Sequence, residues 1–197
     1  MATATAPPVG ILLAAGRGRR FDPSGTRKKL LQLLPGSHDT VLAASARTLT
    51  AALPRVLAVV RPGDDDVAAV LRAAGCEAIV CADADSGMAA SLAAALRAVP
   101  GVASLIVALG DMPWVAPSTV QAVAHALAQG AIIAAPVYQG RRGNPVGLSA
   151  ALLPALLALR GDEGARSLIE RHGFTAVPVD DAGIVRDVDE AGDLTPR

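Results

Sequence analysis

Short apolar segments alternate with alanine-rich amphipathic segments along most of the chain, and this alternation limits the fold more than any other feature. Buried strands are predicted at residues 9–13, 56–60, 77–80, 104–109 and 131–137. Between them, helical spacing of apolar residues predicts helices at 40–53, 64–74, 86–99 and 116–129. Strands and helices that alternate in this way indicate βαβ units. We therefore expect an α/β fold of three layers, with a mostly parallel mixed sheet between two layers of helices.

The predicted helix ends carry suitable capping residues. Residues typical of a helix start stand at Asp39, 64–66, Ser86 and Ser118. Gly75 and Gly130 stand where two of the helices would end. These signals agree with the boundaries that the apolar spacing predicts.

The chain shows neither an internal repeat nor a linker, so we expect one domain over residues 1–197. Residues 1–8 combine small residues with two prolines, which predicts a flexible tail and no signal peptide. Late in the chain, 175–180 and 183–187 have the composition of two further strands. We expect them to form a hairpin or an antiparallel addition at one side of the sheet.

Net charge and cysteine content exclude several classes of protein. Lysine plus arginine number 18 and aspartate plus glutamate number 18, so the formal net charge is zero. A protein that grips nucleic acid or an anionic membrane non-specifically is strongly basic, and we therefore expect neither partner. Cys76 and Cys81 are too few for a disulfide framework, and in an extended segment they would face opposite sides. We expect small buried thiols and a reducing, cytoplasmic location.

A glycine-rich loop follows the first predicted strand. Gly16 and Gly18 allow backbone amides to approach a ligand closely, and successive amides can form an anion-binding concavity. Neighbouring arginines suit phosphate oxygens. Phe21 stands where a dinucleotide-binding fingerprint needs its third glycine, and no GxxxxGK[ST] motif occurs. The alternative is a glycine turn flanked by solvated arginines.

Two other short segments carry charge in informative places. Lys28 and Lys29 precede an apolar pair, which is typical of a solvated element end, but beside a phosphate loop a lysine there suits a triphosphate. Asp111 directly follows the most hydrophobic predicted strand, where a carboxylate can coordinate Mg²⁺. The alternative for Asp111 is a turn or cap residue, although Ser118 is better placed to cap the next helix.

These residues belong to an ordered set of motifs that runs from Leu12 to Asp189. The set comprises Leu13-Ala14-Ala15-Gly16-x-Gly18-x-Arg20-Phe21, Lys29-Leu30-Leu31, Gly87-Met88-x-x-Ser91-Leu92, Leu109-Gly110-Asp111-Met112-Pro113, Arg142-Gly143-x-Pro145-Val146, Gly161-Asp162-x-Gly164-Ala165-Arg166 and Asp187-x-Asp189. Together they resemble the MobA-like NTP transferases, the nucleotidyltransferases of molybdenum cofactor maturation, with related cytidylyltransferases and guanylyltransferases. The resemblance implies a Rossmann-like nucleotidyltransferase fold, similar to that of nucleotide-diphospho-sugar transferases.

The resemblance also implies a role for individual residues. Arg20 and Lys29 would face the triphosphate of the nucleotide, and Asp111 and Asp189 would hold Mg²⁺. The remaining nucleotide-binding residues implied by the motifs are Leu13, Ala14, Ala15, Gly16, Arg17, Gly18, Ser91 and Gly110. A nucleotidyl group would pass to a phosphorylated acceptor and pyrophosphate would leave. Such a transfer depends mainly on positioning and charge neutralisation, and needs no Ser-His-Asp or Cys-His set.

The acceptor side departs from the family pattern. Cytidylyl-type members usually have Gly-His-Pro-Val where this chain has Gly143-Asn144-Pro145-Val146, so Asn144, Pro145 and nearby Trp114 are the predicted acceptor-binding residues. Ala89 stands where the family often has serine, which leaves Ser91 as the hydroxyl or as an ordinary helix residue. Residues 161–166 could equally be a helix start, capped by Asp162 and with Arg166 paired internally.

The expected substrates are CTP and molybdopterin. Guanylyl-type members of the family have a sequence similar to Ala-Gly-Gly where this chain has Ala14-Ala15-Gly16. The additional methyl group of Ala15 would crowd a purine base in the nucleotide site. GTP with molybdopterin or phospho-lactate is the alternative pair. A transient contact with a molybdoenzyme or its chaperone is a further expectation. The competing class is a non-catalytic nucleotide or cofactor carrier on the same fold, which would need no pair of metal-binding acids.

The zero net charge conceals two opposed segments. Residues 17–29 contain six cations and one acid, which gives +5, and residues 180–193 contain six acids and one arginine, which gives −5. The first segment suits a triphosphate and the second suits its metal ion. We therefore expect a metal–nucleotide complex to bind between them.

Overall fold

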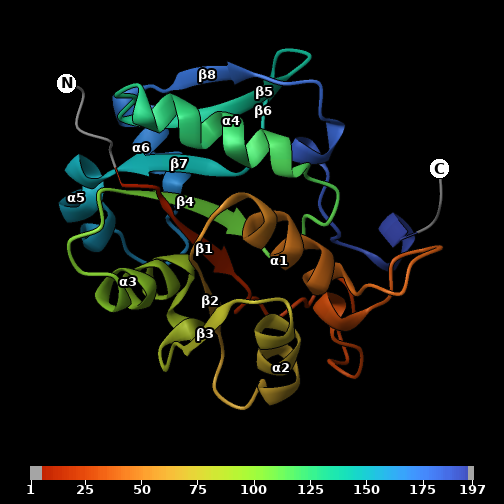
Figure 1. Ribbon diagram of the computed structural model, residues 1–197. Coiled ribbons are helices and arrows are strands. Elements are labelled where there is room, and N and C mark those ends of the chain that lie inside the picture. Colours follow the sequence, from red (N-terminus) through yellow and green to blue (C-terminus); the bar gives the residue numbers. More distant parts are fainter. Residues whose placement is uncertain (1–5, 195–197) are drawn as a thin grey trace.

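The computed structural model describes residues 6–194, and these form a mixed sheet covered by helices on both faces (Figure 1). The strands are β1 (Val9–Leu13), β2 (Val56–Val60), β3 (Glu77–Val80), β4 (Ser104–Leu109), β5 (Ile133–Tyr138), β6 (Arg141–Arg142), β7 (Val146–Ser149) and β8 (Thr175–Pro178). The α-helices are α1 (Val41–Ala52), α2 (Asp65–Ala73), α3 (Met88–Ala98), α4 (Pro117–Ala128), α5 (Leu153–Ala158) and α6 (Ala165–His172). Short 3-10 helices are η1 (Lys29–Leu31), η2 (Ala84–Ser86), η3 (Ala150–Leu152), η4 (Ala182–Val185) and η5 (Ala191–Leu194).

The sheet has the order β3-β2-β1-β4-β7-β5-β6, and β8 also pairs with β5. The pairs β1–β2, β1–β4, β2–β3 and β5–β8 are parallel, whereas β7 runs antiparallel to both β4 and β5. The predicted mostly parallel mixed sheet is therefore confirmed. Strand order reverses at β1 and β4, and in open α/β sheets ligands bind beyond the carboxyl ends of strands at such a point.

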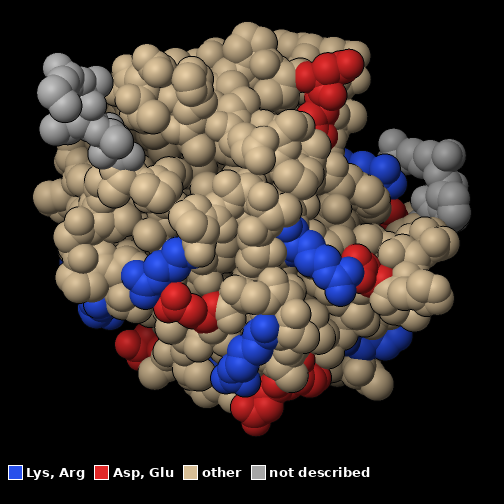
Figure 2. Space-filling model, viewed as in Figure 1, with Lys and Arg blue, Asp and Glu red and all other residues tan. Residues whose placement is uncertain are grey.

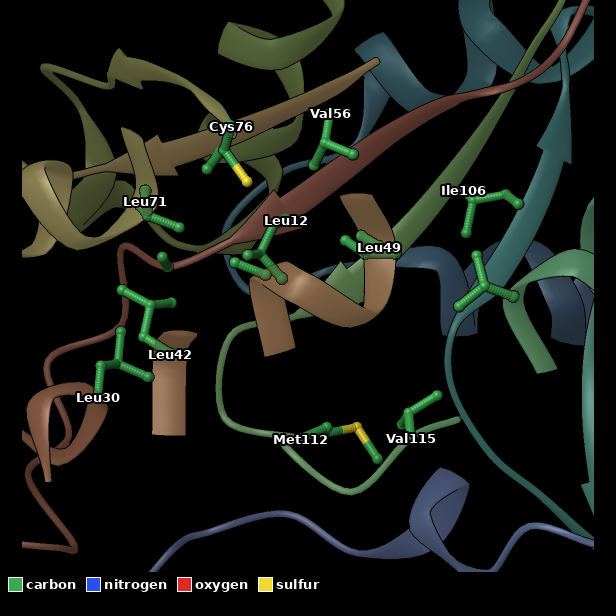
Figure 3. Close-up of a cluster of buried hydrophobic side chains, with 14 of the residues drawn as sticks. Leu12, Leu30, Leu42, Leu49, Val56, Leu71, Cys76, Ile106, Met112 and Val115 are labelled. Atoms are coloured by element: carbon green, nitrogen blue, oxygen red, sulfur yellow. The ribbon is translucent and has the colours of Figure 1, made fainter. Parts of the chain in front are cut away.

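Alternating side chains of the central strands supply two separate cores. Leu12 and Ile106 face the core covered by α1, α2 and α4, while Ile11 and Leu105 face the core covered by α3, α5 and α6. Figure 3 shows the first core, in which Leu42 and Leu49 of α1 meet Leu12. The two cysteines are buried in opposite cores, as their spacing predicts.

Two predicted details of the helix starts are wrong. Thr40 caps α1, because its Oγ1 accepts a hydrogen bond of 3.1 Å from the Ala43 amide, whereas Asp39 pairs with Arg47. Ser118 lies inside α4 and caps nothing. The Asp181 carboxylate takes its place at the start of α4 by accepting hydrogen bonds from the Ala116 amide at 2.9 Å and the Thr119 hydroxyl at 2.6 Å.

Of the other predicted helix ends, some are confirmed and some are wrong. Asp65 and Asp66 do lie in the first turn of α2, and Gly75 and Gly130 have the positive φ angles expected after a helix end. Ser86 belongs to η2, and Gly87 is the residue that precedes α3. At α6 the cap position is Gly164 instead of Asp162, although Arg166 does pair within the helix, with Glu170 at 3.0 Å.

The predicted hairpin late in the chain is also wrong. β8 pairs in parallel with β5, and residues 182–185 form the 3-10 helix η4 instead of a strand. Ile184 is fully buried, and the Asn144 amide donates a hydrogen bond of 2.9 Å to its carbonyl. Position 184 is therefore apolar because it packs against the loop around residue 144 and not because it belongs to a strand.

The ends and surface add two observations. Of the predicted tail, residues 1–5 lie outside the described part, while Pro8 is buried. Basic and acidic side chains lie close together over the lower half of the face in Figure 2, and most of its upper half is uncharged. Within residues 6–194, no helix combines the length and apolar content that a membrane span requires.

Candidate active site

A cleft of about 460 Å³ opens at the carboxyl ends of β1 and β4, between the glycine-rich loop and the start of α3. It is lined by Leu13, Ala14, Ala15, Gly16, Arg17, Gly18, Arg20, Lys29, Leu30, Arg61, Ala84, Asp85, Gly87, Met88, Ser91, Leu109, Asp111, Asp162, Asp187 and Asp189. Most residues predicted to bind nucleotide, triphosphate or metal therefore share one cavity. Gly110, Asn144, Pro145 and Trp114 do not line it.

The glycine-rich loop is held in a definite shape by its own short contacts. Gly18 has φ +60°, a conformation that side chains disfavour, and its carbonyl accepts hydrogen bonds from the Phe21 and Asp22 amides. The Asp22 carboxylate then accepts from Ser24 and from the Arg27 amide, at 2.7 Å for Arg27. These hydrogen bonds, led by that from the Ser24 hydroxyl, hold the pKa of Asp22 below its usual range. This turn leads directly into η1, which begins at Lys29.

The two adjacent lysines face different partners. Lys29 Nζ lies 2.7 Å from Asp111 Oδ2 and 3.6 Å from Asp189 Oδ1, and the lysine side chain is only 12% exposed. Lys28 instead pairs with Asp64 at 2.8 Å and Asp66 at 2.6 Å, outside the cleft. The structure thus separates a buried site lysine from a lysine that ties the loop to α2.

Gly110 positions Asp111 without lining the cleft. Its amide donates to the Leu13 carbonyl at 2.9 Å, and its carbonyl accepts from the buried Ser45 hydroxyl at 3.1 Å. A side chain at this position would meet Leu42 at 3.0 Å, so a glycine lets β1, β4 and α1 approach closely. Asp111 is in this way fixed at the end of β4.

Three carboxylates form a candidate metal centre. One oxygen each from Asp111, Asp187 and Asp189 lies within 4.8 Å of the others. Asp111 Oδ1 is buried and has no hydrogen-bond partner, as expected of an atom that accepts an additional ligand. Partial burial raises the pKa of Asp187, and the negative charge of Asp189 and then that of Asp111 raise it further. Oxygen donors of this kind fit Mg²⁺ or Mn²⁺.

The oppositely charged segments meet at this centre. Arg20 Nη1 lies 2.7 Å from Asp189 Oδ2, and Lys29 contacts the same carboxylate on its other oxygen. Both cations that suit a triphosphate are consequently paired with acids that suit a metal ion. Residues 17–29 and 180–193 therefore contact each other, while a metal–nucleotide complex between them stays a prediction.

A second group of ion pairs also lines the cleft. Asp85 accepts from Arg17 Nε at 3.0 Å and pairs with Arg61 at 2.6 Å. The arginines hold the pKa of Asp85 below its usual range, chiefly through the hydrogen bond from Arg17. Sequence reasoning missed Asp85 and Arg61, since neither lies in a recognised motif. It also left Asp187 without a role, although the spacing Asp187-x-Asp189 was a usable signal.

The predicted acceptor residues lie beside the cleft. Asn144 and Pro145 border a small cavity with Met112 and Val115, on the loop that follows β4. Trp114 belongs to that loop and stacks against Arg186, whose Cζ is 3.7 Å from the ring centroid. Figure 3 shows Met112 and Val115 on this loop, near the C-terminal segment.

A mostly parallel mixed sheet with a glycine-rich loop, two cations and three acids at the carboxyl ends of its central strands is typical of a nucleotidyltransferase. The model of the MobA-like NTP transferase domain matches residues 10–177, and the chain belongs to this family of nucleotidyltransferases. Among curated proteins, none matches this sequence.

Solved structures with the same fold are similar to this chain. Rv0371c from Mycobacterium tuberculosis is similar at 29% identity and a TM-score of 0.79, over 97% of this chain and 96% of that one. A structure described as its complex with manganese matches at 26% identity and a TM-score of 0.74, over 95% and 96%. A nucleotidyl transferase from Methanothermobacter shares the fold at 21% identity, with a TM-score of 0.77 over 95% and 94%.

Proposed function

We propose that this protein is a Mg²⁺-dependent cytidylyltransferase that transfers CMP from CTP to the phosphate of molybdopterin. A phosphate oxygen of the acceptor forms a bond to the α-phosphorus of CTP, the bond between the α- and β-phosphates breaks, and pyrophosphate leaves. The observation that carries the proposal is the meeting of Lys29, Arg20 and the Asp111–Asp187–Asp189 cluster beside the glycine-rich loop.

The chain's own groups would act mainly by positioning and charge. Lys29 and Arg20 would turn from the carboxylates to the phosphate oxygens and stabilise negative charge on the departing pyrophosphate. Amides of the glycine-rich loop would orient the phosphate chain. Ser91 lines the cleft and would contact the nucleotide. Gly110 would act through Asp111, the next residue, by fixing its position at the end of β4.

Asp111, Asp187 and Asp189 would hold the divalent ion. The partnerless Asp111 Oδ1 supports a ligand there, and the manganese complex of the similar Mycobacterium protein supports a divalent one. When bound, the ion would offset the negative charge of the phosphate oxygens that it touches.

The preference for CTP rests on Ala15. Ala15 lines the cleft, and its methyl group would crowd a base larger than cytosine. The resemblance of the chain's motifs to nucleotidyltransferases of molybdenum cofactor maturation supports molybdopterin as acceptor. Asn144, Pro145 and Trp114, which lie outside the cleft lining on the loops that follow β4 and precede β7, are the proposed acceptor side. Transient contact with a molybdoenzyme or its chaperone belongs to the same proposal.

The test measures pyrophosphate release and the mass of the nucleotidylated acceptor, with CTP, GTP, ATP and UTP each offered with molybdopterin or phospho-lactate. We expect CTP with molybdopterin to give the fastest release, and Asp111→Asn to abolish it while circular dichroism stays unchanged. Faster release with GTP would favour guanylyl transfer. Tight nucleotide binding without pyrophosphate from any pair would favour a carrier, and full activity of Asp111→Asn would overturn the assignment.

A further inference from the structure

The three acids of the metal centre come from two segments far apart in the sequence. Asp111 follows β4, whereas Asp187 and Asp189 lie in residues 186–190, which form neither helix nor strand. Carboxylates within 4.8 Å of one another repel. Lys29 and Arg20 offset part of this repulsion at Asp111 and Asp189, and contacts between the two segments must hold the backbone that carries the acids in place.

Several contacts join the segments along one seam. Val188 is fully buried, and its amide donates to the Asp111 carbonyl at 2.9 Å. Gly183 passes so close to the Trp114 carbonyl that a side chain would collide with it. Asp181 adds the cap of α4 described above. The backbone of the acidic segment is thus attached on both sides of residue 186.

The remaining contact in the seam is the stack of Arg186 on Trp114. The guanidinium carbon lies 3.7 Å from the ring centroid, well inside the ~6 Å range over which an aromatic face attracts a cation. Arg186 directly precedes Asp187, and Trp114 follows Asp111 by three residues. Within residues 6–194 the Arg186 side chain is half-buried and has no ion pair, so the stack accounts for its placement.

We propose that Arg186 is a positioning residue, which holds Asp187 and Asp189 against Asp111 through its stack on Trp114 and so sets the affinity of the site for a divalent cation. Arg186 contacts neither the nucleotide cleft nor the three carboxylates. This inference depends on the metal site of the proposed function and adds the element that orients it. Residues that orient metal-binding side chains typically change metal affinity about 10–100-fold when removed.

The chain offers a direct reporter, because Trp114 is its single tryptophan. Titration of the wild-type protein with Mg²⁺ alone is expected to change the tryptophan fluorescence until the site is saturated. Titration with Mn²⁺ alone, followed by electron paramagnetic resonance of the free ion, gives the number of sites and the dissociation constant independently of fluorescence.

In Arg186→Leu we expect affinity for Mn²⁺ to fall about tenfold, with unchanged circular dichroism. Arg186→Lys keeps a cation over the ring and should recover most of the affinity. Trp114→Leu removes the other partner and should give a loss similar to that of Arg186→Leu. Arg72→Leu, at an exposed arginine of α2, is the matched control and should bind Mn²⁺ like the wild type.

The possible failures are distinguishable. Wild-type affinity for Mn²⁺ in a folded Arg186→Leu variant would overturn the positioning role, even if the enzyme transfers CMP as proposed. Absence of any Mn²⁺ binding by the wild type would overturn both the metal site and this inference. An intact Arg186 effect, together with no pyrophosphate from any nucleotide, would leave the inference standing and reject the proposed transfer.

Discussion

Lys29 and Asp111 form a close, largely buried ion pair, with Nζ 2.7 Å from Oδ2, although the proposed function assigns Lys29 to the phosphates of a nucleotide and Asp111 to a metal ion. The same ammonium group lies 3.6 Å from Asp189. Each ligand alone must separate this pair and leave one partner without an opposite charge. Both ligands together satisfy both partners, so binding of one should favour binding of the other.

Lys29→Met tests this competition. Because the variant lacks the cation that neutralises the acids, we expect Mg²⁺ alone to bind about tenfold more tightly, and CTP about tenfold more weakly. Isothermal titration calorimetry of each ligand separately measures both changes. Lys28→Met is the matched control, since Lys28 pairs with Asp64 and Asp66, and it should alter neither affinity appreciably. Weaker binding of both ligands to Lys29→Met would contradict the competition.

Ala15→Gly tests the basis of nucleotide choice. Removal of the methyl group enlarges the cleft, so the ratio of kcat/KM for GTP to that for CTP should rise about tenfold, in keeping with ~1–3 kcal/mol for one methyl-sized contact. Steady-state kinetics with both nucleotides measure the ratio. Ala89→Gly, on the neighbouring α3 but outside the cleft lining, should leave the ratio unchanged. An equal change for CTP and GTP in Ala15→Gly would remove the argument for cytidine.

Gly87→Ala should destabilise the fold. Gly87 has φ +106°, and a Cβ there would collide with the backbone of Gly161, so strain and steric overlap together should cost about 3 kcal/mol. Urea unfolding followed by circular dichroism measures this loss. Gly63→Ala is the control, because Gly63 has φ +79° but open space around its Cβ position, and it should lose only the conformational part, about 1 kcal/mol. Equal losses in both variants would show that the Gly161 contact yields easily.

Cys76 should make stability fall at alkaline pH. Burial raises the pKa of its thiol from 9.0 to about 11, so the unfolded chain loses this proton before the folded protein does. The contribution is fully present below pH 9.0 and is lost as pH rises to about 11. Between these values the wild type should lose about 2 kcal/mol more unfolding free energy than Cys76→Ala. Parallel urea titrations at both pH values measure the difference, and identical pH dependence would contradict it.

Sequence reasoning located the central strands well because their signal is local. Runs such as 56–60 and 105–109 are apolar throughout, and a strand covered on both faces buries most or all side chains of such a run. The same rule failed at Ile184 and Val185. These residues are apolar because η4 packs under the 143–144 turn, a contact between distant segments that periodicity cannot reveal.

Some features of the site were likewise predictable from local sequence, and others were not. Residues 13–18 and Asp111 were predictable, because a glycine-rich loop or an acid directly after a strand is informative by itself. The role of Asp181 as the cap of α4 was not predictable, because the Ala116 amide from which its carboxylate accepts a hydrogen bond lies 65 residues earlier in the chain. Lys28 pairs with Asp64 and Lys29 pairs with Asp111. These different partners depend on where α2 and β4 lie in space, which the sequence alone does not show.

The seam between the Asp111 loop and residues 181–189 has a consequence for biosynthesis. A chain growing on the ribosome would carry the glycine-rich loop, Lys29 and Asp111 well before Asp187 and Asp189 emerge. Until then the α4 cap, the Val188 contact and two of the three carboxylates of the candidate metal centre are all missing. A chain translated only as far as β7 would therefore have most strands of the sheet but would lack the complete candidate metal centre, which can assemble only after Asp187 and Asp189 have been translated.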